Sequence, residues 1–123
     1  ISLVVEGIPV SVNHYVKHTY QGRHYISQKA REFMDNLALA ARSAGQIRGP
    51  EYEVTLRVYL GHRQKGDTDN FAKCALDGLV HSGVIDTDAK IVNLHIYKRR
   101  DHLRPRTEIN IQLARRCNGT TTL

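Results

Sequence analysis

The sequence predicts an α/β (α+β) fold, a two-layer single domain in which one mixed β-sheet packs against two main helices. Three observations predict it. The 123 residues are 41% hydrophobic and 24% charged, which is the composition of one globular domain and not of a disordered chain. Apolar residues recur at three- and four-residue steps after Ser27, and alternate with polar residues from Glu51 to Leu60. Segments with these two periods follow one another along the chain, an order that favours helices layered on one sheet.

The first third of the chain predicts a strand, a small hairpin and a long helix. Leu3 to Ile8 is a short apolar run closed by glycine and proline, and is therefore predicted to be a strand. Pro9 to Tyr20 is polar and irregular, whereas Tyr20 to Ile26 fits a hairpin that turns at a glutamine–glycine pair. Ser27 is the expected N-cap of the long helix, and Gly45 stands where a glycine would end it.

The remaining segments predict three strands and a second helix. Glu51 to Leu60 gives the clearest strand signal, because every second residue is apolar. The second helix is predicted over roughly Asp69 to His81. Ile91 to Lys98 and Thr107 to Leu113 are predicted to form an antiparallel hairpin, with a turn over Asp101 to Pro105. The first of these strands is expected to place three apolar residues on one face: Val92, Leu94 and Ile96.

The expected domain covers residues 1–117, and residues 118–123 are expected to be a flexible tail. Two cysteines are too few for a disulfide scaffold, which favours a reduced, cytoplasmic compartment. No apolar run approaches the ~18 residues that a membrane helix needs, so no membrane association is expected.

Charge is distributed unevenly along the chain. Eighteen basic and twelve acidic residues give a net charge of +6, which favours a polyanionic partner. No acid occurs from Asn13 to Arg31, and bases dominate from Leu94 to Arg116. Five of the twelve acids gather within 22 residues: Asp67, Asp69, Asp77, Asp86 and Asp88. Carboxylates gathered on a basic chain would repel a polyanion locally, unless a bound cation reverses the sign of that charge.

The sequence contains two pairs of aspartates, and in each pair one residue separates the two aspartates. Asp67 and Asp69 lie at a strand-to-helix junction, and Asp86 and Asp88 lie just before a strand. Mg²⁺ prefers oxygen ligands, including one or two carboxylates. A helix over 69–81 rises about 18 Å at ~1.5 Å per residue. The seven steps from 81 to 88 reach up to about 23 Å, so the second pair is able to return beside the first.

One face of the second helix carries charged residues at four-residue steps: Asp69, Lys73 and Asp77. A lysine one turn from a metal carboxylate is able to contact a scissile phosphate or to stabilise charge on the leaving oxygen. Structural roles also explain each residue alone. The first aspartate pair fits an N-cap and first-turn acid, Lys73 fits a surface ion pair, and the second aspartate pair fits a plain turn.

Two other metal sites are excluded. An EF-hand loop would need a ligand and a glycine where Phe71 and Ala72 stand. His14 and His18 are four residues apart but lie in an irregular segment without cysteine or glutamate at ligand spacing, which argues against zinc.

These motifs resemble the RusA family of Holliday junction resolvases, small endonucleases common in phages and prophages. The resemblance covers roughly residues 3–114 and includes the segment Ile8 to Asn13 and the alanine-rich helix after Ser27. Its most specific elements are Asp67-Thr68-Asp69-Asn70-x-x-Lys73, Asp77-Gly78-Leu79, Gly83-Val84 and Asp88-Ala89-Lys90-Ile91-Val92.

The resemblance implies a homodimeric, Mg²⁺-dependent endodeoxyribonuclease with a mixed α/β fold, which resolves four-way DNA junctions by paired phosphodiester cuts in recombination and repair. It implies that Asp67, Asp69 and Asp88 are the metal carboxylates, and that these three and Lys73 are catalytic. Family members often carry two adjacent acids at the downstream position. Here Thr87 stands in the first of those places, so the role of Asp86 is left open.

Basic residues are expected to hold the phosphates of the junction arms. The candidates are Lys17, Arg23, Lys65, Arg99, Arg100, Arg104 and Arg106. The four arginines have too few acids nearby in the sequence to pair with. Two alternative interpretations stay open: a metal-dependent nuclease acting on flaps or other branched DNA, and a non-catalytic basic DNA-binding module.

Overall fold

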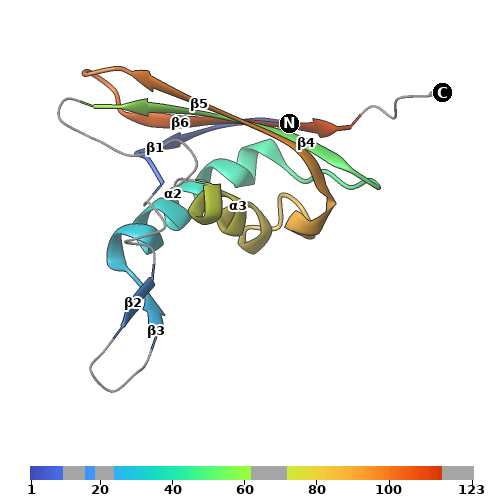
Figure 1. Ribbon diagram of the computed structural model, residues 1–123, viewed down its shortest axis with the longest axis horizontal. Coiled ribbons are helices and arrows are strands. Elements are labelled where there is room, and N and C mark those ends of the chain that lie inside the picture. The colour runs from blue at the N-terminus through green and yellow to red at the C-terminus, as the bar shows by residue number, and fades with distance from the viewer. Residues whose placement is uncertain (10–15, 19–23, 62–71, 115–123) are drawn as a thin grey trace.

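The computed structural model describes residues 1–9, 16–18, 24–61 and 72–114, and gives only the backbone at 16–18 and 24–26 (Figure 1). Helices α2 and α3 cover one face of a four-stranded mixed sheet. This confirms the predicted two-layer fold class. In chain order the elements are β1 (Ser2–Glu6), β2 (Val16–His18), β3 (His24–Ile26), α2 (Gln28–Ala44), β4 (Tyr52–Leu60), α3 (Ala72–His81), the 3₁₀ helix η2 (Asp88–Lys90), β5 (Ile91–Arg100) and β6 (Arg106–Leu113).

The strand order in the sheet is β1-β6-β4-β5, so β4 lies between β6 and β5. β4 pairs antiparallel with β6 and parallel with β5, and β1 pairs antiparallel with β6. The apolar residues of β4 are fully buried, as their alternation predicts for a central strand: Tyr52, Val54, Leu56, Val58 and Leu60.

The predicted hairpin of the last two strands is wrong, because β4 lies between them. Neighbouring strands are ~4.8 Å apart, so the chain must cross about 10 Å to skip one strand. The five residues from Asp101 to Pro105 reach up to about 16 Å and make this crossing over the end of β4. There the amide of Asp101 donates a hydrogen bond of 2.9 Å to the carbonyl of Leu60. A short connection therefore did not imply that the two strands pair.

The apolar face predicted for β5 forms only in part. Leu94 and Ile96 both align with buried residues of β4, but Ile96 packs against the core whereas Leu94 is 38% exposed. Val92 lies at a register shift, because Ile91 pairs with Tyr52 whereas Asn93 pairs with Glu53. Val92 is consequently 48% exposed. β5 is an edge strand, and its charged end at Lys98 to Arg100 is typical of edges that resist pairing with another chain.

Both predicted signals at the ends of α2 are confirmed. Ser27 has an extended backbone, and its hydroxyl accepts a hydrogen bond of 3.3 Å from the amide of Ala30. Gly45 has φ +87°, a conformation that glycine adopts without strain, and its amide donates to the carbonyl of Ala41. The sequence therefore defines this helix at both of its ends.

The other predicted elements occur with shifted bounds. The first strand ends at Glu6, before the predicted Ile8. The small hairpin pairs β2 with β3, and β2 lies in the segment predicted to be irregular. Its glutamine–glycine turn lies outside the described residues. The second helix is described from Ala72 onwards, so its predicted start at Asp69 also lies outside them.

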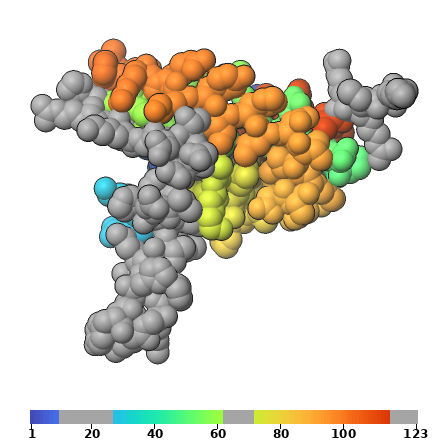
Figure 2. Space-filling view, viewed as in Figure 1, coloured from blue at the N-terminus to red at the C-terminus, as the bar shows by residue number. Residues whose placement is uncertain are grey.

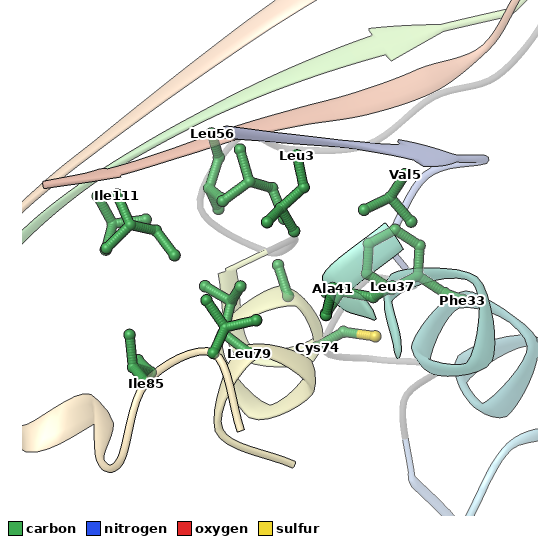
Figure 3. Close-up of a cluster of buried hydrophobic side chains, with 14 of the residues drawn as sticks. Leu3, Val5, Phe33, Leu37, Ala41, Leu56, Cys74, Leu79, Ile85 and Ile111 are labelled. Carbon is green, nitrogen blue, oxygen red and sulfur yellow. The ribbon is translucent and has the colours of Figure 1, made fainter. Parts of the chain in front are cut away.

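The hydrophobic core fills the space between the sheet and the two helices (Figure 3). Side chains of β1, β4 and β6 point towards those of α2, α3 and the segment after α3. The residues labelled there are Leu3, Val5, Phe33, Leu37, Ala41, Leu56, Cys74, Leu79, Ile85 and Ile111. The side chain of Cys74 is buried within this core. None of the described helices is long and apolar enough to cross a membrane.

Core packing at Leu79 should hold α3 against the sheet. Leu79→Ala is expected to lower the free energy of unfolding by about 2–5 kcal/mol, because the substitution leaves a cavity in a fully buried site. The matched control is Leu39→Ala on α2, where the side chain is 62% exposed and the expected change is below about 0.5 kcal/mol. Urea denaturation measures both variants, and equal effects would contradict the packing described for α3.

Candidate metal and nucleic-acid site

Part of the predicted site lies in the described residues. Lys73 is on α3, Asp88 begins η2, and the four arginine candidates lie in or between β5 and β6. Lys17 has a described backbone but no described side chain. The other predicted residues lie outside the described residues: Arg23, Lys65, Asp67 and Asp69.

Two of the three residues of the predicted charged face, Lys73 and Asp77, lie together on α3, and the third, Asp69, lies outside the described residues. Lys73 and Asp77 form an ion pair with Nζ and Oδ2 3.4 Å apart, and the buried residues Ala75 and Leu79 lie on the opposite side of the helix. The Lys73 side chain is 55% exposed, so the ion pair is solvated and contributes little to stability. Breaking this one ion pair would therefore cost little energy.

The turn after α3 is anchored in the core. Val84 and Ile85 are fully buried. The carbonyl of Val84 accepts hydrogen bonds from the amide of Ile47 at 2.9 Å and from the guanidinium of Arg48 at 3.0 Å. Arg48 also donates to the carbonyl of Gly83 at 3.2 Å. The backbone leading to Asp86 is therefore held from the segment that precedes β4.

Asp86 uses both of its carboxylate oxygens in hydrogen bonds. Its Oδ1 accepts from the hydroxyl of Tyr52 at 2.7 Å and from the amide of Thr87 at 3.0 Å, while Oδ2 accepts from Nζ of Lys90 at 2.7 Å. The hydrogen bonds from Lys90 and then Tyr52 hold the pKa of Asp86 well below its usual range. Burial and the bond to Asp86 raise the pKa of Tyr52. Asp86 is therefore an ionised carboxylate that already has partners.

Asp88 differs from Asp86 in its surroundings. Thr87 caps η2, because its hydroxyl accepts a hydrogen bond of 3.2 Å from the amide of Ala89. Asp88 is the first residue of η2 and is exposed. Within the described parts of the chain, no hydrogen bond or ion pair engages its carboxylate. The two aspartates therefore differ in their hydrogen bonding, a difference that their spacing in the sequence does not reveal.

A complete metal centre is not present among the described residues, where no three histidine, cysteine or acidic side chains gather closely enough to hold a metal ion. Asp88 alone does not make such a centre. The expected partner ligands Asp67 and Asp69 lie in the segment between Gly61 and Ala72 that the structure does not describe.

Arg104 and Arg106 have acidic partners, so the expectation that the arginine candidates have too few acids to pair with is wrong for these two. Arg104 bonds Glu6 at 2.7 Å. Arg106 bonds Asp101 at 2.7 Å and Glu108 at 2.9 Å, and its side chain is only 16% exposed. Because β1 runs beside β6, Glu6 approaches from a position 98 residues away in the sequence. Counting acids along the sequence does not detect a pair of this kind.

The other two arginines are arranged differently. Arg99 is exposed, and its guanidinium carbon lies 5.3 Å from the ring centroid of Tyr97. Arg57 of β4 approaches the same ring at 5.6 Å, so two cations contact Tyr97. Tyr97 pairs with Arg57, which alternates with the buried residues of β4, so this contact lies on the sheet face away from the core. Arg100 donates a hydrogen bond of 3.1 Å to the carbonyl of Gly61.

The candidate elements share one exposed side of the molecule. Figure 2 shows α3, the turn after it and β5 in contact with one another across this side. The sequence matches the family model described as endodeoxyribonuclease RusA over residues 6–112, which is nearly the whole chain. The chain belongs to the RusA endodeoxyribonuclease family. Membership implies a Holliday-junction-resolving endonuclease, and it confirms the family resemblance of the motifs. A search of curated proteins finds no matching relative.

The donor chemistry of this RusA chain fits Mg²⁺. An exposed carboxylate is the hard oxygen ligand that Mg²⁺ prefers, and Asp88 offers one next to a structurally fixed turn. Asp86 is less suited to be a ligand, because the ammonium of Lys90 already occupies one of its oxygens.

Sequence reasoning missed two residues around this RusA site. Tyr52 is one of the alternating apolar residues of the strand predicted from Glu51 to Leu60, and the alternation does not show the polar partner that a buried tyrosine hydroxyl usually requires. Its partner, Asp86, is 34 residues away in the sequence. Arg57 is one of the polar residues that alternate with apolar ones in the strand predicted from Glu51 to Leu60, and its contact with Tyr97 depends on the register between β4 and β5.

Proposed function

We propose that this RusA-family protein is a Mg²⁺-dependent endodeoxyribonuclease that resolves four-way DNA junctions in the cytoplasm by paired phosphodiester cuts. The observation that carries the proposal is the family match, which spans every residue of the expected catalytic set. The open carboxylate of Asp88 and the solvated ammonium of Lys73 support it, because both groups are accessible to a cation or a phosphate.

The residues divide the chemistry between them. Asp67, Asp69 and Asp88 would hold the cation, which when bound supplies Lewis-acid polarisation of the phosphate and a water of lowered pKa. Lys73 would leave its ion pair with Asp77 and stabilise the charge that develops on the leaving oxygen. Arg99 and Arg100 would hold phosphates of a junction arm, which positions the DNA without selecting its sequence.

The functional unit is proposed to be a homodimer with two-fold symmetry. A four-way junction is resolved by two cuts in symmetry-related strands, and one chain of this size supplies one set of the expected acids. A two-fold dimer presents two sets with the symmetry of the two target strands.

Cleavage of synthetic DNA tests the proposed activity. A labelled four-way junction should be cut in the presence of Mg²⁺ and left intact in EDTA, because the carboxylates alone cannot activate water. Flaps and linear duplexes of the same sequence should be cut more slowly. Equal rates on flaps and junctions would favour the flap nuclease, and no cleavage of any substrate would favour a DNA-binding module.

Single substitutions connect that cleavage to the proposed ligands. Asp67→Asn, Asp69→Asn and Asp88→Asn should each slow cleavage by more than about 100-fold, since even the outer partners of metal ligands cost 10–100-fold. Junction binding should be kept or strengthened, because negative charge near the phosphates is removed. Asp35→Asn, on the exposed side of α2, makes the same chemical change as a control. A variant of the proposed ligands that cuts at the wild-type rate would refute that ligand assignment.

Lys73→Ala should slow cleavage by about 100-fold or more, in the range of other groups that stabilise transition-state charge, with little change in junction affinity. The ion pair with Asp77 provides the control, because Asp77→Asn breaks the same pair and keeps the ammonium. Rates and affinities of both variants are measured by gel assays. If the two variants lose activity equally, the lysine acts through its ion pair and not on the phosphate.

The slope of log affinity against log salt concentration reports how many phosphates the protein neutralises. Arg99→Ala should reduce the steepness of that slope by about 0.9 for each phosphate that the arginine neutralises in the wild type. Arg42→Ala removes the same side chain from the exposed last turn of α2 and should leave the slope unchanged. An unchanged slope for Arg99→Ala would mean that Arg99 only protects the sheet edge from pairing.

Sedimentation should report about twice the chain mass at micromolar concentration, because the proposed unit is a two-fold dimer. The measurement is made without DNA and with a four-way junction. A protein that remains monomeric in both cases would contradict the proposed dimer and favour a nuclease that makes single cuts.

A further inference from the structure

The Asp86 clasp joins the start of β4 to the turn that carries Asp88. We define the clasp as Tyr52, Asp86 and Lys90, linked by the two hydrogen bonds of 2.7 Å that end on the Asp86 carboxylate. The two donors come from different parts of the fold. Tyr52 begins the central strand, whereas Lys90 is the last residue of η2.

Tyr52 gives the clasp a fixed base. Its side chain is fully buried, and it is the largest fully buried side chain of the described core. Its hydroxyl also lies 3.4 Å from the carbonyl of Ile47, the residue whose amide bonds Val84. Movement of the hydroxyl would require the close-packed core to move. The position of Asp86 is therefore set by the interior of the protein, although Asp86 itself is on the surface.

Lys90 and Asp86 flank Asp88, the residue whose carboxylate is accessible to a ligand. Their ion pair spans η2, and Asp88 lies midway between them in the sequence. Thr87 donates its amide to Asp86 and accepts from Ala89, so both neighbours of Asp88 have fixed backbones. The backbone at Asp88 is thus held on both sides, while its carboxylate has no partner among the described residues.

We propose that Asp86 is a positioning residue whose clasp with Tyr52 and Lys90 aims the Asp88 carboxylate at a divalent cation, and that Asp86 is not itself a ligand. The proposal rests on the function proposed above, in which Asp88 binds metal. A cation approaching Oδ2 of Asp86 would meet the ammonium of Lys90 at close range and would have to break their ion pair. An ion pair this exposed adds little stability, which leaves the orientation of η2 as its main effect.

Binding of Mn²⁺ to the full chain without DNA tests the proposal, with the free ion followed by electron paramagnetic resonance. Tyr52→Phe removes one hydroxyl and keeps the buried ring. It should weaken Mn²⁺ binding by about 10-fold, as removal of an outer partner of a ligand does. The Mg²⁺ concentration for half-maximal junction cleavage should rise by the same factor, with the maximal rate changed less than twofold. Tyr59→Phe removes a hydroxyl from the other end of the same strand and should bind Mn²⁺ like the wild type.

A double-mutant cycle separates a clasp from a ligand. If Asp86 acts through the clasp, Asp86→Ala should weaken Mn²⁺ binding, and adding Tyr52→Phe to it should weaken binding no further. Loss of Mn²⁺ binding in Asp86→Ala with wild-type binding in Tyr52→Phe would make Asp86 a ligand and overturn the proposal. If Asp86→Ala does not fold, Lys90→Met takes its place in the cycle. A lower melting temperature with unchanged Mn²⁺ affinity would also overturn it, because the clasp would then be structural only.

Asp88→Asn distinguishes failure of this inference from failure of the proposed function. If Asp88→Asn loses Mn²⁺ binding while Tyr52→Phe keeps wild-type affinity, the positioning role is wrong and the metal ligand stands. If Asp88→Asn binds Mn²⁺ like the wild type, Asp88 is not a ligand, and both the ligand assignment and the positioning role are wrong.

Discussion

The parallel pairing of β4 with β5 is the constraint on which the rest of the structure depends. Parallel neighbours cannot be joined by a tight turn, so the chain must return along the sheet between the end of one strand and the start of the next. That return segment, residues 61–90, includes α3 and η2 and carries every candidate metal ligand. Leu79, Val84 and Ile85 bury its apolar side. Its charged side, with Lys73 and Asp88, is consequently left to solvent.

The fold was predictable where a signal is local, and not where it depends on pairing between distant segments. Ser27 and Gly45 define α2 because a cap involves residues three or four positions apart. Alternation identified β4, since burial on one face requires a period of two. Neither signal says which strands are neighbours. The last two strands were therefore predicted to pair with each other, whereas each of them pairs with β4. The register shift that exposes Val92 is likewise a property of two strands together.

The candidate site follows the same division. Spacing was enough to select Lys73 and the two aspartate pairs, because a helix repeat and a one-residue gap are visible in the sequence. Spacing could not separate Asp86 from Asp88. Their difference comes from the hydroxyl of Tyr52, which reaches Asp86 from the start of the central strand. The partner of Arg104 was hidden for the same reason, because strand pairing brings Glu6 to it.

Charged residues in and beside β5 fall into two groups. Some form ion pairs within the fold, and others are accessible to a ligand. Asp86 and Lys90 neutralise each other just before the strand, so the charge of Asp88 is left without a partner in the described chain.

Arg99 lies near the opposite end of β5, and the strand from Ile91 to Arg99 is about 26 Å long at ~3.3 Å per residue. Because the Debye length is about 8 Å at physiological ionic strength, Arg99 does not balance the charge of Asp88. DNA rises ~3.4 Å per base pair, so a phosphate at Arg99 would lie several nucleotides from one near Asp88. Arg99 is therefore suited to holding a DNA arm, whereas in the proposed function the charge at the reacting phosphate would be supplied by a cation and by Lys73.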